Sequence, residues 1–151
     1  MPAISFSIPD LVPKIFSGRK VNTIRPIYTG KPCRFEPGGR LYLYWKQRTR
    51  QCTKLGEAKC RGVSFLLPRD PAPGSEAVYF AGSPTFRELE NLAAIEGFDN
   101  GLDLVFALWH FYGRALKKGQ IRAFASVRWS DFSRDLFAEK RLARLGLLEG
   151  K

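Results

Sequence analysis

Apolar and polar residues alternate most regularly between Arg40 and Lys46. A strict period of two predicts a β-strand with one buried and one exposed face. The exposed face interleaves cations with aromatic rings, a combination that contacts phosphates and stacks on bases in nucleic-acid-binding proteins. Tyrosines that only cover a neighbouring strand give the same pattern. The buried face carries Leu41, Leu43 and Trp45, and the exposed face carries Arg40, Tyr42, Tyr44 and Lys46.

Several other segments are predicted to be extended, separated by Pro and Gly residues that end regular structure. A helical turn opens at Pro9 and stops at Gly18, and residues 47–54 form a polar hairpin or loop. The predicted extended segments are Ile4–Ile8, the stretch after Gly18 up to Pro26, Leu55–Leu67 with a bend at Gly62, Ala77–Ala81 and Ile121–Trp129.

From residue 83 onward, apolar residues recur at spacings of three and four, which predicts helices. The first helix has Ser83 as N-cap and Pro84 at its first position. The second begins near Asn100 and ends at Gly113. Ser130 is predicted to cap a last helix, whose apolar side carries Phe132, Leu136, Phe137 and Leu145.

These elements predict an α+β fold. Antiparallel strands with helices gathered between the late strands are typical of a small, partly closed β-barrel with helices packed at its side. We expect residues 1–130 to form this domain and residues 131–151 to form a helical extension packed on it. No internal repeat or linker is visible in the sequence.

Positive charge is concentrated in one third of the chain. Residues 19–69 hold 13 Lys or Arg against Glu36 and Glu57, whereas the remainder holds 12 basic and 12 acidic residues, so the net charge of +11 arises in this segment. A localised positive field favours a polyanion partner, because each neutralised phosphate releases counterions. Solubility or a membrane-surface patch would also use such charge, but the segment does not have the pattern of an amphipathic helix.

The sequence gives little sign of a metal, a cofactor or a membrane segment. Cys33, Cys52 and Cys60 lack metal-ligand spacing, and His110 lies far from them in the sequence. We therefore expect free thiols and no metal or cofactor. The chain has no apolar run of about 18 residues and no secretory signal pattern, so a cytoplasmic location is expected.

A resemblance to a known family rests on the segment SGRKVNTIRP, residues 17–26. Gly18, Lys20, Thr23 and Arg25 match the pattern GxKxxTxR in full. With ISFS before it, GGRLYLY and LGEAKCRGV after it, and IEGFDN at residues 95–100, the chain resembles the ASCH (activating signal cointegrator homology) family over about residues 3–129.

The resemblance implies a PUA-like β-barrel with a basic cleft near the motif, used for RNA or nucleotide-like ligands. Family members differ in function. Some look like plain RNA-binding modules, some small bacterial ones hydrolyse the N4-acetyl group of acetylcytidine nucleosides, and ribonuclease activity has been attributed to others. Membership of the fold alone does not choose among these functions.

The amidohydrolase pattern of the family places its lysine and threonine on Lys20 and Thr23, and its glutamate on Glu96, with Glu90 as the substitute. An amine flanked by arginines and partly desolvated is shifted toward its neutral form, which acts as a base or nucleophile. A regular strand would turn Lys20 away from Thr23, so Lys20 is expected in the turn after Gly18 or at a bulge. In the other interpretation, Lys20 and Arg25 only grip phosphates and Thr23 bonds to the turn.

We therefore expect a protein that binds RNA or a nucleotide in a basic cleft and hydrolyses it, as a ribonuclease or as an N4-acetylcytidine amidohydrolase. The alternative is a non-catalytic RNA-binding or regulatory module. A protein-interaction domain would leave the localised charge unexplained. The predicted nucleic-acid contacts are Arg19, Lys20, Arg25, Arg40, Tyr42, Tyr44, Lys46, Arg48 and Arg50.

Overall fold

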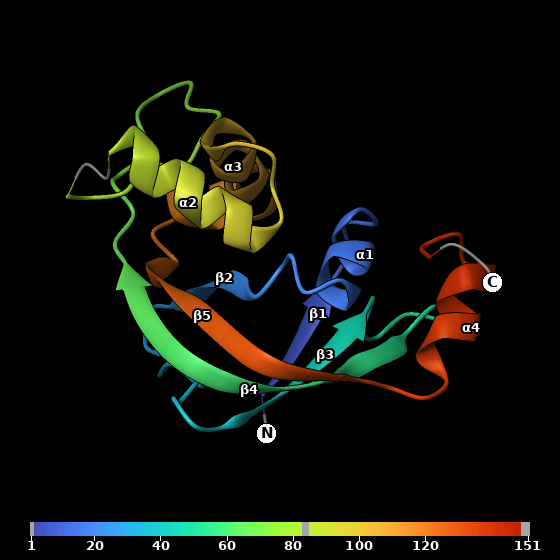
Figure 1. Ribbon diagram of the computed structural model, residues 1–151. Helices are drawn as coiled ribbons and strands as arrows, with labels where there is room; N and C mark the ends of the chain where they lie inside the picture. Colours follow the sequence, from blue (N-terminus) through green and yellow to red (C-terminus); the bar gives the residue numbers. More distant parts are fainter. Residues whose placement is uncertain (1, 83–84, 149–151) are drawn as a thin grey trace. The chain divides into compact units, whose positions relative to one another are not determined.

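A computed structural model describes residues 2–82 and 85–148 of the chain (Figure 1). The strands are β1 (Ala3–Phe6), β2 (Asn22–Tyr28), β3 (Arg40–Trp45), β4 (Thr53–Leu66) and β5 (Ile121–Arg134). The helices are α1 (Leu11–Phe16), α2 (Phe86–Glu96), α3 (Gly101–Lys117) and α4 (Ala138–Arg144). Along the described residues the order of elements is β1, α1, β2, β3, β4, α2, α3, β5 and α4.

The strands form one mixed sheet in the order β1-β3-β4-β5-β2. β1 pairs with β3 in parallel, and β3 pairs with β4 in antiparallel orientation. The sheet therefore has β1 and β2 as its edges. The predicted α+β class, a small barrel-type sheet with helices packed beside strands, is confirmed by these elements.

The chain divides into two compact units. The first comprises residues up to 21, 35–62 and those from 128 onward, and it holds β1, α1, β3 and α4. The second comprises residues 22–34 and 63–127, and it holds β2, α2 and α3. β4 and β5 each contribute one part to each unit.

The first unit is built on the alternation that the sequence displays in β3. Leu41, Leu43 and Trp45 are almost fully buried, as predicted. The register pairs Leu43 with Ile4 and Trp45 with Phe6, both buried residues of β1. Directly paired residues point to the same side of a sheet, so β1 and β3 share one apolar face.

The second unit packs α2 and α3 around the rings of Phe80, Tyr112 and Phe124. The Phe124 ring contacts the other two edge-on, with centroid distances of 6.0 Å to Phe80 and 5.7 Å to Tyr112. α3 begins next to Asn100, as predicted, and the structure shows that the Asn100 side chain caps the helix by accepting a hydrogen bond from the amide of Asp103. The predicted cap at Ser83 and Pro84 lies outside the described residues.

Two predictions in this region are wrong. α3 does not end at Gly113 but continues to Lys117. Gly113 is buried there, and a Cβ at this position would lie 2.7 Å from ring atoms of Trp109, so the glycine makes room for that indole. The segment Ala77–Ala81 does not form a strand; it contributes an isolated bridge between Phe80 and Pro68.

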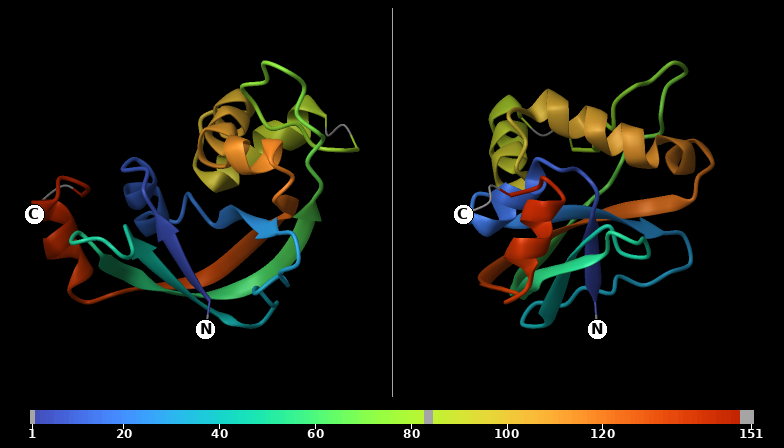
Figure 2. Two further views of the ribbon diagram at one scale, coloured as in Figure 1. Left: turned by 180° about the vertical axis from the view of Figure 1, so that it is seen from behind. Right: turned by 90° about the vertical axis from the view of Figure 1, so that its right-hand side faces the viewer.

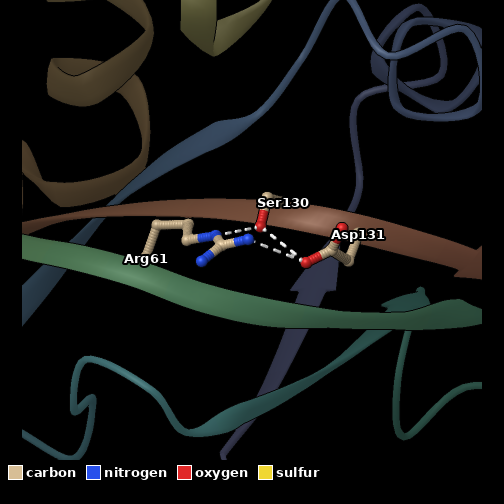
Figure 3. Close-up of polar contacts among 3 residues, drawn as sticks. All are labelled: Arg61, Ser130 and Asp131. Carbon is tan, nitrogen blue, oxygen red and sulfur yellow. Dashed lines mark hydrogen bonds and ion pairs between the residues drawn. The ribbon is translucent and has the colours of Figure 1, made fainter.

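The prediction that Ser130 caps the last helix is also wrong. Ser130 lies within β5, which continues to Arg134, so the strand crosses the boundary proposed at residue 130. Its hydroxyl bonds to Arg61 of β4 and to Asp131, and Arg61 forms an ion pair with Asp131 at 3.0 Å (Figure 3). This partner across the sheet, invisible in local sequence, keeps the segment extended.

The helix that follows, α4, uses other apolar residues than those predicted. Ala138 and Leu142 are its buried residues. Leu136 and Phe137 are exposed, whereas Phe132 of β5 packs edge-on against Phe16 of α1 at a centroid distance of 5.6 Å. Because the helix starts seven residues later than predicted, it buries a different face.

Replacing Gly56 by alanine is expected to destabilise the protein by about 3 kcal/mol, within the usual range for overpacking. A Cβ at Gly56 would clash with the backbone carbonyl of Ser133 and lie 2.7 Å from the Phe132 ring. Gly62 of the same strand has no atom within 4 Å of the equivalent position. Urea unfolding should therefore show a large loss for Gly56→Ala and almost none for Gly62→Ala; equal losses would contradict this explanation.

Candidate functional site

Lys20 is a buried lysine in the first unit. Gly18 adopts φ +80°, and the amide of Lys20 donates to the carbonyl of Lys14 at 2.9 Å, so Lys20 lies in the turn after Gly18, as expected. The side chain is 1% exposed. Its Nζ lies 5.5 Å from the ring centroid of Phe6 and 6.0 Å from that of Trp129, which places the amine on the buried side of β1 and β3.

Glu96 is a buried carboxylate in the second unit, at the C-terminal end of α2. The side-chain amide of Asn22 donates to Glu96 Oε1 and to Ser126 Oγ, the latter at 3.0 Å. All three residues are buried. Glu90, the substitute candidate, accepts a hydrogen bond from the amide of Gly101 at 2.8 Å, which gives its carboxylate a structural role at the start of α3.

Thr23 and Arg25 lie side by side on β2. Arg25 Nε donates to Thr23 Oγ1 at 3.0 Å, and Thr23 is buried while Arg25 is half-buried. Burial raises the pKa of the nearby Tyr112, and the Arg25 guanidinium opposes this rise. Burial and the charge of Arg25 also lower the pKa of Arg34. The motif arginine therefore lies in a positive, partly desolvated environment next to a neutral phenol.

The predicted contacts on β3 face away from Lys20. Tyr42 and Tyr44 alternate with the buried residues of the strand and are half-exposed. The ammonium of Lys54 lies 5.2 Å from the Tyr42 ring centroid, and its hydrogen bond to Glu57 raises the pKa of Lys54. Glu57 also pairs with Arg40 at 3.7 Å. A pocket of about 410 Å³ opens on this face, lined by Gly38, Gly39, Arg40, Glu57, Ala58, Lys59, Asp131 and Ser133.

The remaining predicted contacts lie in turns of the first unit. Arg19 is exposed beside Lys20, and Arg48 and Arg50 are exposed in the turn between β3 and β4. Lys46 begins that turn, with its Nζ 5.3 Å from the Trp45 ring centroid. The structure thus separates the predicted residues of the first unit into a buried lysine and an exposed, cation-rich set.

Among the described residues, no three His, Cys, Asp or Glu side chains gather in a way that could hold a metal ion. Within the described part of the chain, Cys33, Cys52 and Cys60 form no disulfide. None of the helices in the described segments has the length and apolar content needed to cross a bilayer.

Sequence reasoning missed Asn22, Ser126 and Tyr112. Asn22 occupies an unspecified position inside GxKxxTxR, and Ser126 is a lone hydroxyl within an apolar run of β5. A polar residue inside a strand that is otherwise buried needs a partner, which is a usable signal for Ser126. Tyr112 offers no such signal, because its role depends on the packing of α3 beside Arg25.

The comparisons with known proteins support the fold. The structure is similar to the crystal structure of protein EF3133 from Enterococcus faecalis V583, which is assigned to the family DUF984. The TM-score is 0.51 at 14% sequence identity, and the match covers 88% of this chain and 82% of that one. A scan against protein-family models gave no match, and neither did a search of curated proteins.

Asn22→Asp is expected to make stability pH-dependent, because it sets a second carboxylate against Glu96. Two buried carboxylates in contact raise each other's folded pKa. When the pKa of a carboxyl group is higher in the folded state, the folded protein keeps its stability below the pKa of the unfolded state, which is about 4. The free energy of unfolding then falls as the pH rises toward 7, here by about 3 kcal/mol.

Urea unfolding from about pH 4 to 7 measures this change. Asn91→Asp adds the same charge at an exposed position of α2 and serves as the control. A pH profile of Asn22→Asp that matches this control would contradict the hydrogen-bond assignment.

Proposed function

We propose that the chain is an ASCH-type protein that binds RNA or a nucleotide-like ligand at the GxKxxTxR segment and hydrolyses it there. The observation that carries this proposal is the burial of polar groups around the motif. Six polar or charged residues are buried among those described, and all but Thr53 lie in the motif segment or bond to it. These five are Lys20, Asn22, Thr23, Glu96 and Ser126.

Burying a charge is costly unless the environment compensates for it, so several buried polar residues within one short motif are more typical of a functional segment than of a core. Lys20 and Asn22 are two residues apart in the chain, and Asn22 holds the carboxylate of Glu96. The one segment therefore supplies an amine and orients an acid. Because Lys20 and Asn22 are so close in the sequence, we favour a hydrolytic enzyme over a protein in which Lys20 only binds phosphate.

In the proposed reaction each residue has a separate task. Burial favours the neutral form of an amine, so Lys20 takes a proton from the attacking water. The water oxygen adds to the acyl carbon, the C–N bond breaks, and the departing amine receives the proton. Thr23 donates a hydrogen bond to the developing oxyanion, and Glu96 orients the water or relays the proton. Arg25 fixes Thr23 and contacts the ligand's negative charge.

A non-catalytic RNA-binding module is the second candidate. The exposed face of β3 favours it, because Tyr42, Tyr44 and Arg40 lie on the side of the strand opposite to the buried lysine. Rings and cations on an open strand surface bind single strands without any chemistry.

Lys20→Arg should nearly abolish turnover and leave ligand affinity within about twofold, because a guanidinium still donates hydrogen bonds to a ligand but does not act as a base. Acetylcytidine and single-stranded RNA are the substrates to assay, with binding measured separately. Glu96→Gln should also lose most turnover. If the two residues act as a unit, the double variant should be little worse than either single one.

If Lys20→Arg retained its activity, Lys20 would not be the base, and its role would be to bind phosphate. A wild-type protein that binds RNA but processes neither substrate would leave the binding module as the function.

Tyr44→Ala should weaken binding of single-stranded RNA by about 1–3 kcal/mol if the ring stacks on a base. Turnover of a free nucleoside should not change, since Tyr44 faces away from the buried side of β3. Tyr79→Ala removes a tyrosine that is 62% exposed in the second unit and is the matched control. Equal affinities for the two variants would show that the β3 face does not contact RNA.

A further inference from the structure

The C-terminal helix is joined to the turn between β3 and β4 by one arginine. Arg141 Nε donates to Thr53 Oγ1 at 2.8 Å, and its Nη2 donates to the carbonyl of Arg50 at 2.9 Å. Figures 1 and 2 show α4 beside this end of β3 and β4. Because Arg141 bonds to both the turn and the first residue of β4, α4 and the turn present one continuous surface.

Hydrogen bonds within the turn and to β1 restrain the conformation of the turn. Thr49 Oγ1 donates to the carbonyl of Lys46 at 2.7 Å, and the carbonyl of Thr49 accepts from the amide of Cys52 at 3.1 Å. The amide of Gln47 donates to Ser5 Oγ of β1 at 2.9 Å. A preordered backbone loses little further entropy on binding.

Four cations project from this surface without an acidic partner. Arg48 and Arg50 on the turn and Lys140 and Arg144 on α4 are exposed and make no ion pair with any described residue. The carboxylate of α4, Glu139, is already paired with Arg134. We call Arg48, Arg50, Lys140 and Arg144 the C-terminal basic surface.

An aromatic ring lies in line with the cations of the helix. Phe137 is 82% exposed. Phe137, Lys140 and Arg144 are spaced by three and four residues, so they share one face of α4, opposite to the buried Ala138 and Leu142. An exposed ring beside two cations matches the stacking and phosphate contacts that single strands require.

We propose that the C-terminal basic surface binds the phosphate backbone of single-stranded RNA, with a base stacked on Phe137. An anionic membrane fits less well, because only Leu136 and Phe137 are exposed apolar residues here and α4 has seven residues. The inference rests on the proposed function in taking RNA as partner. It adds a surface whose residues are separate from Lys20, Thr23 and Glu96.

The test compares two charge reversals of equal size. Lys140→Glu/Arg144→Glu changes the proposed surface, whereas Arg114→Glu/Lys118→Glu changes an exposed pair of the same spacing at the end of α3. Affinity for an oligouridylate of about 12 nucleotides is measured by fluorescence anisotropy at several salt concentrations. The first variant should bind at least about tenfold more weakly and lose about 0.7 from the salt slope per lost phosphate contact, and the control should lose clearly less.

Further variants and ligands keep the result unambiguous. Arg48→Glu/Arg50→Glu reverses the same surface without touching α4, and Phe137→Ala should lower affinity about fivefold or more. Affinity for the DNA oligonucleotide of the same sequence is measured as well. Equal affinity for DNA and RNA would show that the surface recognises the phosphodiester backbone that both share. Circular dichroism melting confirms that each variant is folded.

Equal binding by the α4 variant and its control would overturn the inference while leaving salt-dependent RNA binding intact. Binding to phosphatidylserine vesicles in place of RNA would also overturn it. Turnover of acetylcytidine by Lys140→Glu/Arg144→Glu should equal that of wild type, so failure of this inference is distinguishable from failure of the proposed function.

Discussion

The structure of the second unit depends on the hydrogen bonds of Asn22. This buried side chain reaches Glu96 and Ser126, which follow it by 74 and 104 residues in the chain. It thereby joins β2, the end of α2 and the middle of β5 through one amide. A buried carboxylate without donors would cost several kcal/mol, so the position of Glu96 and the identity of Asn22 constrain each other.

The sequence predicted those elements whose pattern is set locally. In β3 the alternation of Leu41, Leu43 and Trp45 with polar residues matches the observed burial. A period of two places alternate residues on opposite faces of a strand, so the pattern alone determines which face is buried. The failures at Gly113 and Ser130 have a common cause. Each residue is a normal helix terminator or cap in isolation, but the indole of Trp109 and the guanidinium of Arg61 decide its role in the folded chain.

For the candidate site too, local sequence predicted only those features that do not depend on distant partners. Lys20 and Thr23 lie within a short motif, and the turn at Gly18 follows from local geometry. Asn22, Ser126 and Tyr112 act through partners that are distant in sequence, and such pairings cannot be derived from a single chain. A fold shared with EF3133 at 14% identity makes the same point, since the arrangement of elements survives when most side chains differ.

Acidic residues in the first unit lie beside some of its cations and not beside others, so the local positive field differs between parts of its surface. Glu57 pairs with Lys54 and Arg40, Asp131 with Arg61, and Glu139 with Arg134, so these acids neutralise cations on the sheet and at the base of α4. Exposed pairs of this kind contribute little to stability, but they lower the local field. Arg48 and Arg50 of the turn and Lys140 and Arg144 of α4 pair with none of the acids in the described part of the chain.

Attraction between such exposed cations and a polyanion weakens as salt screens it, within a Debye length of about 8 Å at physiological ionic strength. Salt screens the buried amine of Lys20 much less, because burial keeps mobile ions away from it. In the proposed function, a salt-sensitive surface would therefore hold the polyanion, while a separate group that is less sensitive to salt would act on the bound ligand.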